Sequence, residues 1–315
     1  MRHFLQEHDF SEDEIKQIFT SAFELKSKRM DRPTNCLNGE SWGMMFYKQS
    51  TRTRVSFEVG IRELGGNPVI LDQSTTQIGR GESIADTALV LSRFLDGLII
   101  RSHGHNMIQE FAKFAEIPVI NALTDLLHPC QIYSDCMTIL EKFNCGTNPF
   151  EDLKGKKIAF YGDTSCNMAN SWILAGAIFE MEISLCGPSG YEPKEEIQHI
   201  LHSQRLNSTW TFTPDPELGA QNADVVYTDV WVSMGCEEES QKRTESMKPY
   251  QVSDSVIGHA QKNCLFMHCM PAHPGEEVTQ SVLESERAIL FDQAENRLHM
   301  QKSILSALSK LNSQK

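Results

Sequence analysis

Residues 50–54 place hydroxyl and guanidinium side chains where a helix should begin. The run reads Ser-Thr-Arg-Thr-Arg, follows the apolar residues 43–47, and precedes apolar residues that recur at helical spacing over residues 55–64. A helix N-terminus offers unpaired backbone N–H groups and the positive end of the helix dipole, which both favour an anion. An arginine there can bind a phosphate through two hydrogen bonds. The run indicates a phosphate site, although a capped helix with two solvated arginines is the alternative for this segment alone.

The run at residues 50–54 belongs to a chain in which predicted strands and helices alternate, and these elements position it. Helical periodicity is clear over residues 84–95 and 167–179, and Ser11 with Glu14 forms a capping box ahead of an opening helix. Strands separated by helices predict an α/β fold whose parallel sheets are covered on both faces. The apolar stretches that we predict to be strands are residues 43–47, 68–72, 96–102, 118–122, 156–162, 182–187, 209–213, 224–228, 264–268 and 288–292.

The length of the chain predicts two domains. With 315 residues it exceeds what one hydrophobic core usually supports, so we expect two domains of roughly 150 residues each. The best boundary is the turn-rich segment at residues 144–149, which follows an apolar helix. We therefore place the first domain at residues 1–145 and the second at residues 146–294. An amphipathic helix over residues 295–311 follows.

Charge and composition exclude several classes of function. The net charge of −13 argues against nucleic acid or an anionic membrane as a partner. No apolar run reaches the ~18 residues that span a bilayer. The first residues lack signal- or transit-peptide character, so we expect a cytoplasmic protein.

Cysteines and glycines give no sign of a metal or an organic cofactor. The nine cysteines are dispersed through core segments, which fits reduced thiols rather than disulfides or zinc ligands. Residues 161–165 follow a predicted strand, but they lack the second and third glycines of the dinucleotide fingerprint. We therefore expect neither a metal site nor an NAD site.

The run at residues 50–54 resembles the phosphate-binding signature of the aspartate and ornithine carbamoyltransferases. Three further motifs follow in the order and approximate spacing of the ornithine enzymes: His-Pro-Cys-Gln at 128–131, Asp-Val-Trp-Val-Ser-Met-Gly at 229–235, and His-Cys-Met-Pro at 268–271. These four motifs extend over most of the chain. The resemblance implies two parallel-sheet domains, the first for carbamoyl phosphate and the second for ornithine, with residues 295–315 packing back on the first.

The activity implied by the resemblance is transfer of the carbamoyl group from carbamoyl phosphate to L-ornithine. The products would be L-citrulline and phosphate, made in arginine biosynthesis without metal or organic cofactor. Aspartate is disfavoured as the acceptor, because its pocket should present cations whereas Asp229 suits a substrate with a positive end. A carbamoyltransferase acting on putrescine or an N-acylated ornithine stays open, as does a catalytically silent structural homologue.

The resemblance also implies site residues and an assembly. Arg101, His128, Asp229 and Cys269 match catalytic residues. Those that match carbamoyl phosphate-binding residues are Ser50, Thr51, Arg52, Thr53, Gln77, Arg101, His128, Gln131, Cys269, Met270 and Arg297. Asn167, Asp229, Ser233 and Met234 match ornithine-binding residues. Family enzymes form homotrimers with shared sites, to which Gln77 would contribute across a subunit boundary. We interpret the charged segment at residues 235–250 as a mobile lid.

Overall fold

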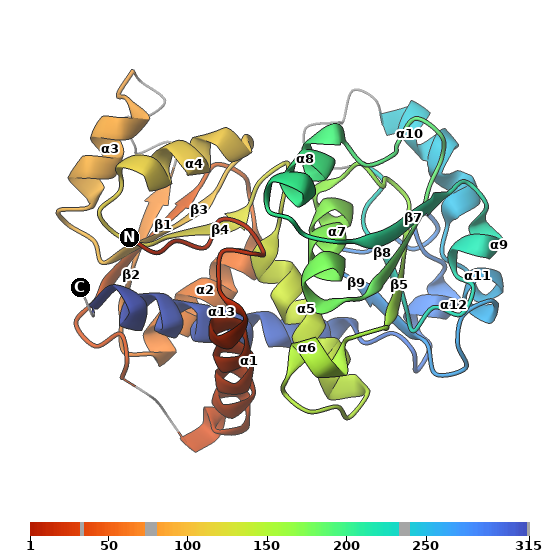
Figure 1. Ribbon diagram of the computed structural model, residues 1–315, viewed down its shortest axis with the longest axis horizontal. Helices are drawn as coiled ribbons and strands as arrows, with labels where there is room; N and C mark the ends of the chain where they lie inside the picture. Colours follow the sequence, from red (N-terminus) through yellow and green to blue (C-terminus); the bar gives the residue numbers. More distant parts are fainter. Residues whose placement is uncertain (32–34, 73–80, 233–239, 314–315) are drawn as a thin grey trace. The chain divides into compact units, whose positions relative to one another are not determined.

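The computed structural model describes residues 1–31, 35–72, 81–232 and 240–313, and the chain divides into two compact units (Figure 1). Unit 1 contains Met1–Asp152 and Glu295–Lys315, and unit 2 contains Leu153–Ala294. The turn-rich segment that we chose as the boundary precedes the short helix α6, Pro149–Asp152, which belongs to unit 1. Unit 1 is therefore built from two separate stretches of the chain.

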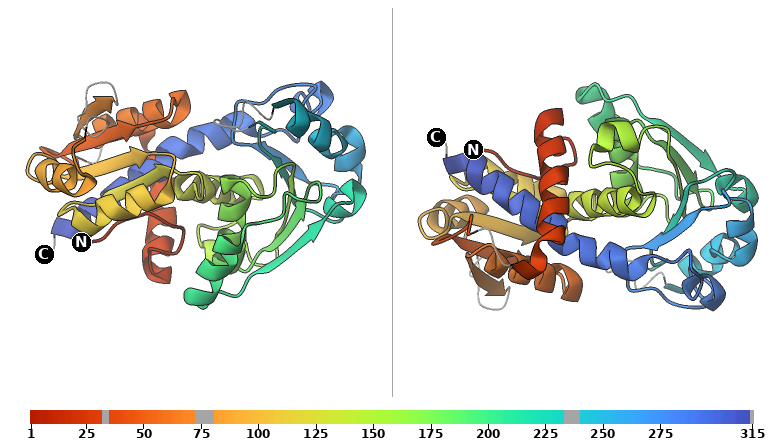
Figure 2. Two further views of the ribbon diagram at one scale, coloured as in Figure 1. Left: turned by 90° about the horizontal axis from the view of Figure 1, so that it is seen from above. Right: turned by 90° about the horizontal axis from the view of Figure 1, so that it is seen from below.

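Unit 1 is a parallel sheet covered by helices on both faces. Its strands follow the order β2-β1-β3-β4, and every pair is parallel. Helices α3 and α4 cover one face, and α1 and α13 lie on the other (Figures 1 and 2). The strands are β1 (Ser41–Phe46), β2 (Asn67–Asp72), β3 (Gly97–Arg101) and β4 (Val119–Leu123). The helices are α1 (Glu12–Ser27), η1 (Arg29–Asp31), α2 (Thr51–Glu63), α3 (Ile84–Leu91), α4 (His105–Phe114), α5 (Pro129–Lys142) and the C-terminal α13 (Leu290–Ser313).

Unit 2 repeats this architecture with a parallel sheet in the order β7-β6-β5-β8-β9. Helices α7 and α8 cover one face, and α9, α11 and α12 lie on the other (Figure 1). The strands are β5 (Lys157–Tyr161), β6 (Glu182–Cys186), β7 (Thr209–Thr213), β8 (Val225–Thr228) and β9 (Leu265–His268). The helices are α7 (Asn167–Phe179), α8 (Glu195–Ser203), α9 (Pro216–Gly219), α10 (Ser240–Met247), η5 (Lys248–Tyr250), α11 (Asp254–Gly258) and α12 (Gln280–Leu283).

The predicted fold class is confirmed, and one local prediction is wrong. Residues 288–292 are not a strand: Ala288 makes one isolated bridge to Phe266, and helix α13 already begins at Leu290. A short apolar run cannot be assigned by periodicity alone, because it fits a buried strand and a buried helical turn equally well. The segment that we interpreted as a lid is helical in its described part, since α10 and η5 occupy it from Ser240 onward.

Other predictions concern the N-terminus, the cysteines and the membrane. Helix α1 begins with the expected capping box, in which Ser11 Oγ accepts the Glu14 N–H and Glu14 accepts the Ser11 N–H. Every cysteine within the described ranges is a free thiol. In those same ranges, no helix is both long and apolar enough to cross a bilayer.

The pairing of β1 with β3 sets where the polar residues of unit 1 emerge. Trp42 pairs with Gly97 at the start of the two strands, and Phe46 pairs with Arg101 at their carboxyl ends. Trp42 is fully buried, and a Cβ atom added to Gly97 would lie 2.4 Å from its ring. A side chain at position 97 would therefore displace the Trp42 ring or separate the two strands at this point.

We predict that Gly97→Ala destabilises the protein by about 1–3 kcal/mol, the usual cost of overpacking a filled core. Urea unfolding of both proteins measures the difference. Gly258→Ala is the matched control, since a Cβ atom there meets nothing within 4 Å. The explanation is wrong if Gly97→Ala is as stable as the control.

Candidate functional site

Each sheet has one position where successive connections leave in opposite directions. In unit 1 this switch point lies between β1 and β3, and in unit 2 it lies between β5 and β8. Open α/β sheets bind ligands beyond the carboxyl ends of their strands at such points. The motifs at residues 50–54 and 128–131, with Arg101, lie in unit 1, and those at residues 229–235 and 268–271 lie in unit 2.

The N-terminus of α2 has the form expected of an anion site. Ser50 is its N-cap and accepts the Thr53 N–H at 3.3 Å. The first turn contains no acidic side chain that would oppose an anion. Arg54 lies 3.5 Å from the Asp72 carboxylate, whereas Arg52 makes no ion pair within the described part of the chain. The two arginines of the run are therefore in different environments, and Arg52 is the one available to a ligand.

Unit 1 buries two guanidinium groups, those of Arg101 and Arg297. Arg101 ends β3 and is 7% exposed, and Arg297 on α13 is 4% exposed. The Arg297 Nη2 donates a hydrogen bond to Thr53 Oγ1, which connects the C-terminal helix to the first turn of α2. A guanidinium keeps its proton at any physiological pH, so this region of unit 1 is positive and favours an anion.

His128 lies in the same positive region. Burial lowers its pKa well below the ordinary value of 6.5, and the charges of Arg297 and Arg101 lower it further. The imidazole is therefore neutral at physiological pH, and it can donate one N–H without adding positive charge. His128 is the N-cap of α5 and Pro129 follows at the first helical position, which fixes the local backbone. The structure thus brings Thr53, Arg101, His128 and Arg297 together.

The first turn of α5 adds an amide with an available acceptor. Gln131 is buried, and its Nε2 donates to Asp135 Oδ1 at 2.8 Å. Its Oε1 is buried and has no hydrogen-bond partner among the described residues. A buried acceptor without a donor is costly, so this oxygen is suited to a ligand N–H. Cys130 between these residues is not reactive, because burial raises the pKa of its thiol.

Unit 2 presents a thiol and a carboxylate at neighbouring strand ends. Asp229 follows β8, Cys269 follows β9, and these strands are paired in parallel. The Cys269 Sγ donates to Asp229 Oδ1 at 2.9 Å, and the Val230 N–H donates to the same oxygen at 2.8 Å. Asn167 is the first residue of α7, whose N-cap thiol, Cys166, has its pKa raised by burial and by the charges of Asp163 and Asp229. The Asp229 carboxylate therefore lies near the start of α7.

Three residues that the motifs did not predict, His268, Glu277 and Gln293, hold the segment around Cys269 in place. His268 is buried; its Nδ1 accepts the Met270 N–H at 2.8 Å, and its Nε2 lies 3.3 Å from Glu277 Oε1. Gln293 Oε1 accepts the backbone N–H of His268 at 3.0 Å. Met270 has the unusual φ of 63°, which turns the backbone directly after Cys269. The position of His268 in the motif at residues 268–271 could have identified this residue from the sequence. Glu277 could not be identified in that way, because only the folded loop brings it to His268.

Three side chains in this region have potential metal-ligand atoms close to one another. The ligand atoms of Asp229, His268 and Cys269 lie within 4.8 Å of one another. However, the Cys269 thiol donates to Asp229, and the ring of His268 is engaged by Met270 and Glu277. These contacts give each of the three side chains a polar partner within the protein. Gln77, Ser233 and Met234, also predicted as site residues, lie outside the described residues.

Comparison with known proteins identifies the family. Residues 2–141 match the family described as "Aspartate/ornithine carbamoyltransferase, carbamoyl-P binding domain", and residues 154–308 match "Aspartate/ornithine carbamoyltransferase, Asp/Orn binding domain". The ornithine carbamoyltransferase of Geobacter sulfurreducens is 45% identical over 311 residues, which are 98% of this chain and 100% of that protein.

Solved structures agree with this assignment. The ornithine carbamoyltransferase from Pyrococcus furiosus is 40% identical with a TM-score of 0.87, over 98% of this chain and 97% of that one. The anabolic ornithine carbamoyltransferase from Campylobacter jejuni is 35% identical with a TM-score of 0.89, over 99% of this chain and 100% of that one. With both family descriptions matched and the whole length aligned, this chain belongs to the aspartate/ornithine carbamoyltransferase family.

Proposed function

We propose that the protein transfers the carbamoyl group of carbamoyl phosphate to the side-chain amine of L-ornithine, giving L-citrulline and phosphate in arginine biosynthesis. The observation that carries this proposal is the meeting of Thr53, Arg297 and the neutral His128 in unit 1. This anion site occurs in a chain that is 45% identical to an ornithine carbamoyltransferase over 311 residues. A cytoplasmic location stays a prediction.

We infer that unit 1 supplies most of the residues that bind carbamoyl phosphate. The α2 N-terminus and Arg52 bind the phosphate, and Arg101, Arg297 and Thr53 extend the positive region toward the carbonyl. Gln131 Oε1 accepts a hydrogen bond from the carbamoyl NH₂. The complete proposed set is Ser50, Thr51, Arg52, Thr53, Gln77, Arg101, His128, Gln131, Cys269, Met270 and Arg297.

The chemical step requires negative charge to develop on the carbonyl oxygen as the amine attacks. Preorganised donors aimed at that oxygen are each worth ~2.7–4 kcal/mol of barrier in comparable enzymes. Thr53, Arg101 and His128 supply such donors in this proposal. Because the pKa of His128 is lowered, the imidazole donates its hydrogen bond as a neutral group and stays neutral throughout the physiological range.

The amine must lose a proton before it attacks. An alkyl ammonium with a pKa of ~10.4 costs ~4.6 kcal/mol to deprotonate at pH 7. The Asp229 carboxylate, which accepts a hydrogen bond from the Cys269 thiol at 2.9 Å, orients the amino acid and receives the proton of its amine. His268 and Glu277 hold the backbone of Met270 so that its carbonyl is available to the substrate. The proposed ornithine-binding residues are Asn167, Asp229, Ser233 and Met234.

We predict that Arg52→Ala weakens carbamoyl phosphate binding roughly tenfold or more, since hydrogen bonds to charged groups are worth ~1.5–3 kcal/mol. Calorimetric titration measures the affinity, and a melting curve checks the fold. Arg54→Ala is the matched control: it lies on the same helix but faces Asp72, and it should bind as wild type does. Undiminished binding by Arg52→Ala would contradict the proposed phosphate site.

We predict that Asp229→Asn lowers citrulline formation by about 10²–10⁴-fold, the usual contribution of an acid–base group. Wild-type protein should also strongly prefer ornithine to putrescine, which leaves the groups for the α-carboxylate unpaired. Asp215→Asn, which alters the N-cap of α9, serves as the control and should retain full activity. Equal or better turnover of putrescine would make a diamine the substrate.

We further propose a homotrimer whose sites are shared between subunits. Each site would take Arg101 from one chain and Gln77 from the next around a ring. Homotrimers of Arg101→Ala or Gln77→Ala should therefore both be poor enzymes. In a mixed trimer, one boundary joins a Gln77→Ala chain to an Arg101→Ala chain in the productive order, so about one site in three is rebuilt.

Co-refolding the two variants, with mass measurement of the mixed trimers and a citrulline assay, tests this sharing. We expect mixed trimers to recover up to about a third of wild-type activity. Each variant refolded with itself is the control and should gain nothing. Mixed trimers without a gain would show that the sites are not shared.

A further inference from the structure

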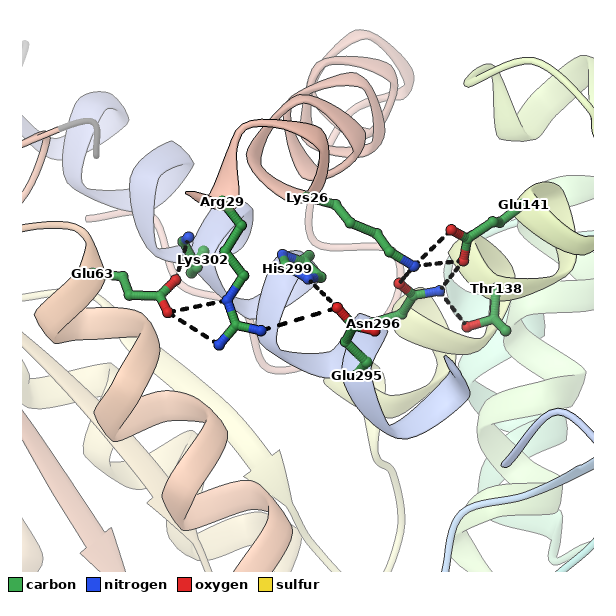
Figure 3. Close-up of polar contacts among 9 residues, drawn as sticks. All are labelled: Lys26, Arg29, Glu63, Thr138, Glu141, Glu295, Asn296, His299 and Lys302. Carbon is green, nitrogen blue, oxygen red and sulfur yellow. Dashed lines mark hydrogen bonds and ion pairs between the residues drawn. The ribbon is translucent and has the colours of Figure 1, made fainter. Parts of the chain in front are cut away.

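Asn296 is a buried amide with every polar hydrogen in use. It lies on α13 directly before Arg297 and is fully buried. Its Nδ2 donates to Thr138 Oγ1 at 3.0 Å and to Glu141 Oε2 at 2.9 Å, and its Oδ1 accepts from Lys26 Nζ at 2.8 Å (Figure 3). An amide satisfied in this way has one orientation, because rotating it would break all three bonds.

Lys26 and Glu141 complete the cluster around this amide. The Lys26 Nζ donates to the two Glu141 carboxylate oxygens at 2.6 and 2.8 Å, and its third hydrogen bond goes to Asn296. Lys26 is on α1, Glu141 on α5 and Asn296 on α13, so three helices are joined at one point (Figure 3). The lysine is 21% exposed and the glutamate 30%, so solvent screens this pair only in part.

A second group of contacts holds α13 to α2. Lys302 lies 2.7 Å from Glu63, the last residue of α2, and its side chain is only 4% exposed. Arg29 approaches the same carboxylate at 3.2 Å (Figure 3). These contacts lie on the C-terminal side of Arg297, and the Asn296 cluster lies on its N-terminal side. Arg297 is thus placed between two points at which its helix is fixed.

Three of the helices joined in this way, α2, α5 and α13, carry or adjoin residues of the anion site. Helix α2 begins with Thr53 in its first turn, and α5 begins directly after His128. Arg297 contacts Thr53 and acts electrostatically on His128. A small displacement of α13 would therefore move a charged donor away from both groups at once. Misplacing such a group by about 1 Å can cost 10²-fold in rate.

We propose that the cluster Lys26–Asn296–Glu141 is a positioning device for Arg297, and through it for carbamoyl phosphate. This inference rests on the role of Arg297 in the proposed function. The cluster touches no substrate; it fixes the helix on which Arg297 lies and the helix that His128 begins. Its loss should raise the KM for carbamoyl phosphate and leave the KM for ornithine unchanged, because the proposed ornithine-binding residues belong to unit 2.

Asn296→Leu, of similar size but without hydrogen bonds, tests the inference. We expect the KM for carbamoyl phosphate to rise by roughly tenfold to a hundredfold. Lys26→Met, which alters a partly exposed member of the cluster, should shift the same KM in the same direction even if Asn296→Leu folds poorly. Ser309→Ala is the control, because it removes a bond from the far end of α13 to Glu40 and should leave both KM values unchanged.

A double-mutant cycle with Arg297→Ala decides whether the cluster acts through Arg297. The double variant Asn296→Leu/Arg297→Ala should bind no worse than Arg297→Ala alone, whereas independent effects would add. Titration of the same four proteins with inorganic phosphate measures the binding affinities for the cycle without turnover. Additive losses, or an unchanged KM in Asn296→Leu and Lys26→Met, would overturn the inference and leave the proposed function intact. An Arg297→Ala variant that binds as wild type does would overturn both the role of Arg297 and the inference.

Discussion

Burying positive charge is the constraint on which the site in unit 1 depends. Arg101 and Arg297 are both nearly inaccessible to solvent, and a guanidinium cannot escape this cost by losing its proton. The nearby imidazole can: burial and the two arginines depress the pKa of His128, so it is neutral. The result is a positively charged region that also contains a neutral hydrogen-bond donor, as the proposed binding of carbamoyl phosphate requires. Both properties follow from one arrangement of charge.

The two parallel sheets separate the chemical tasks. At the switch point of unit 1, strand and helix ends collect hydroxyls and guanidiniums, which suit an anionic donor substrate. In unit 2, the neighbouring ends of β8 and β9 collect a carboxylate and a thiol, which suit an ammonium group. In both units the central strands are buried and mostly apolar, and the polar motif residues lie where these strands end. This division explains why no single short segment reveals the substrate pair.

Helix α13 links stability to binding in unit 1. Its polar contacts with α1, α2 and α5 satisfy buried hydrogen-bonding groups, which would destabilise the fold if they had no partner. The same helix carries Arg297, so the helix that completes the core also supplies a residue of the proposed carbamoyl phosphate site. His299 illustrates how closely this helix is packed: burial lowers its pKa despite the nearby Glu295 carboxylate. A chain without α13 would lose both the packing and the charge at Thr53.

Local sequence determined the elements and the motifs. Hydrophobic periodicity located the strands and α7, and the capping box at Ser11 located the start of α1, because these signals depend on neighbours a few residues apart. The motif residues in the described chain also lie where predicted, at strand and helix ends. Periodicity failed at residues 288–292, where four apolar side chains fit a strand as well as the first turn of α13.

Only the tertiary structure decided which of these residues meet. Thr53 and Arg297 are 244 positions apart, and Asn296 and Thr138 are 158 apart, so no local pattern connects them. Glu277 contacts His268 because the loop after Met270 turns back, and the neutral state of His128 depends on burial and on two distant arginines. Charge state and orientation are properties of the surroundings. A sequence names the groups that can do chemistry, whereas the distances that set their pKa values and hydrogen bonds exist only after folding.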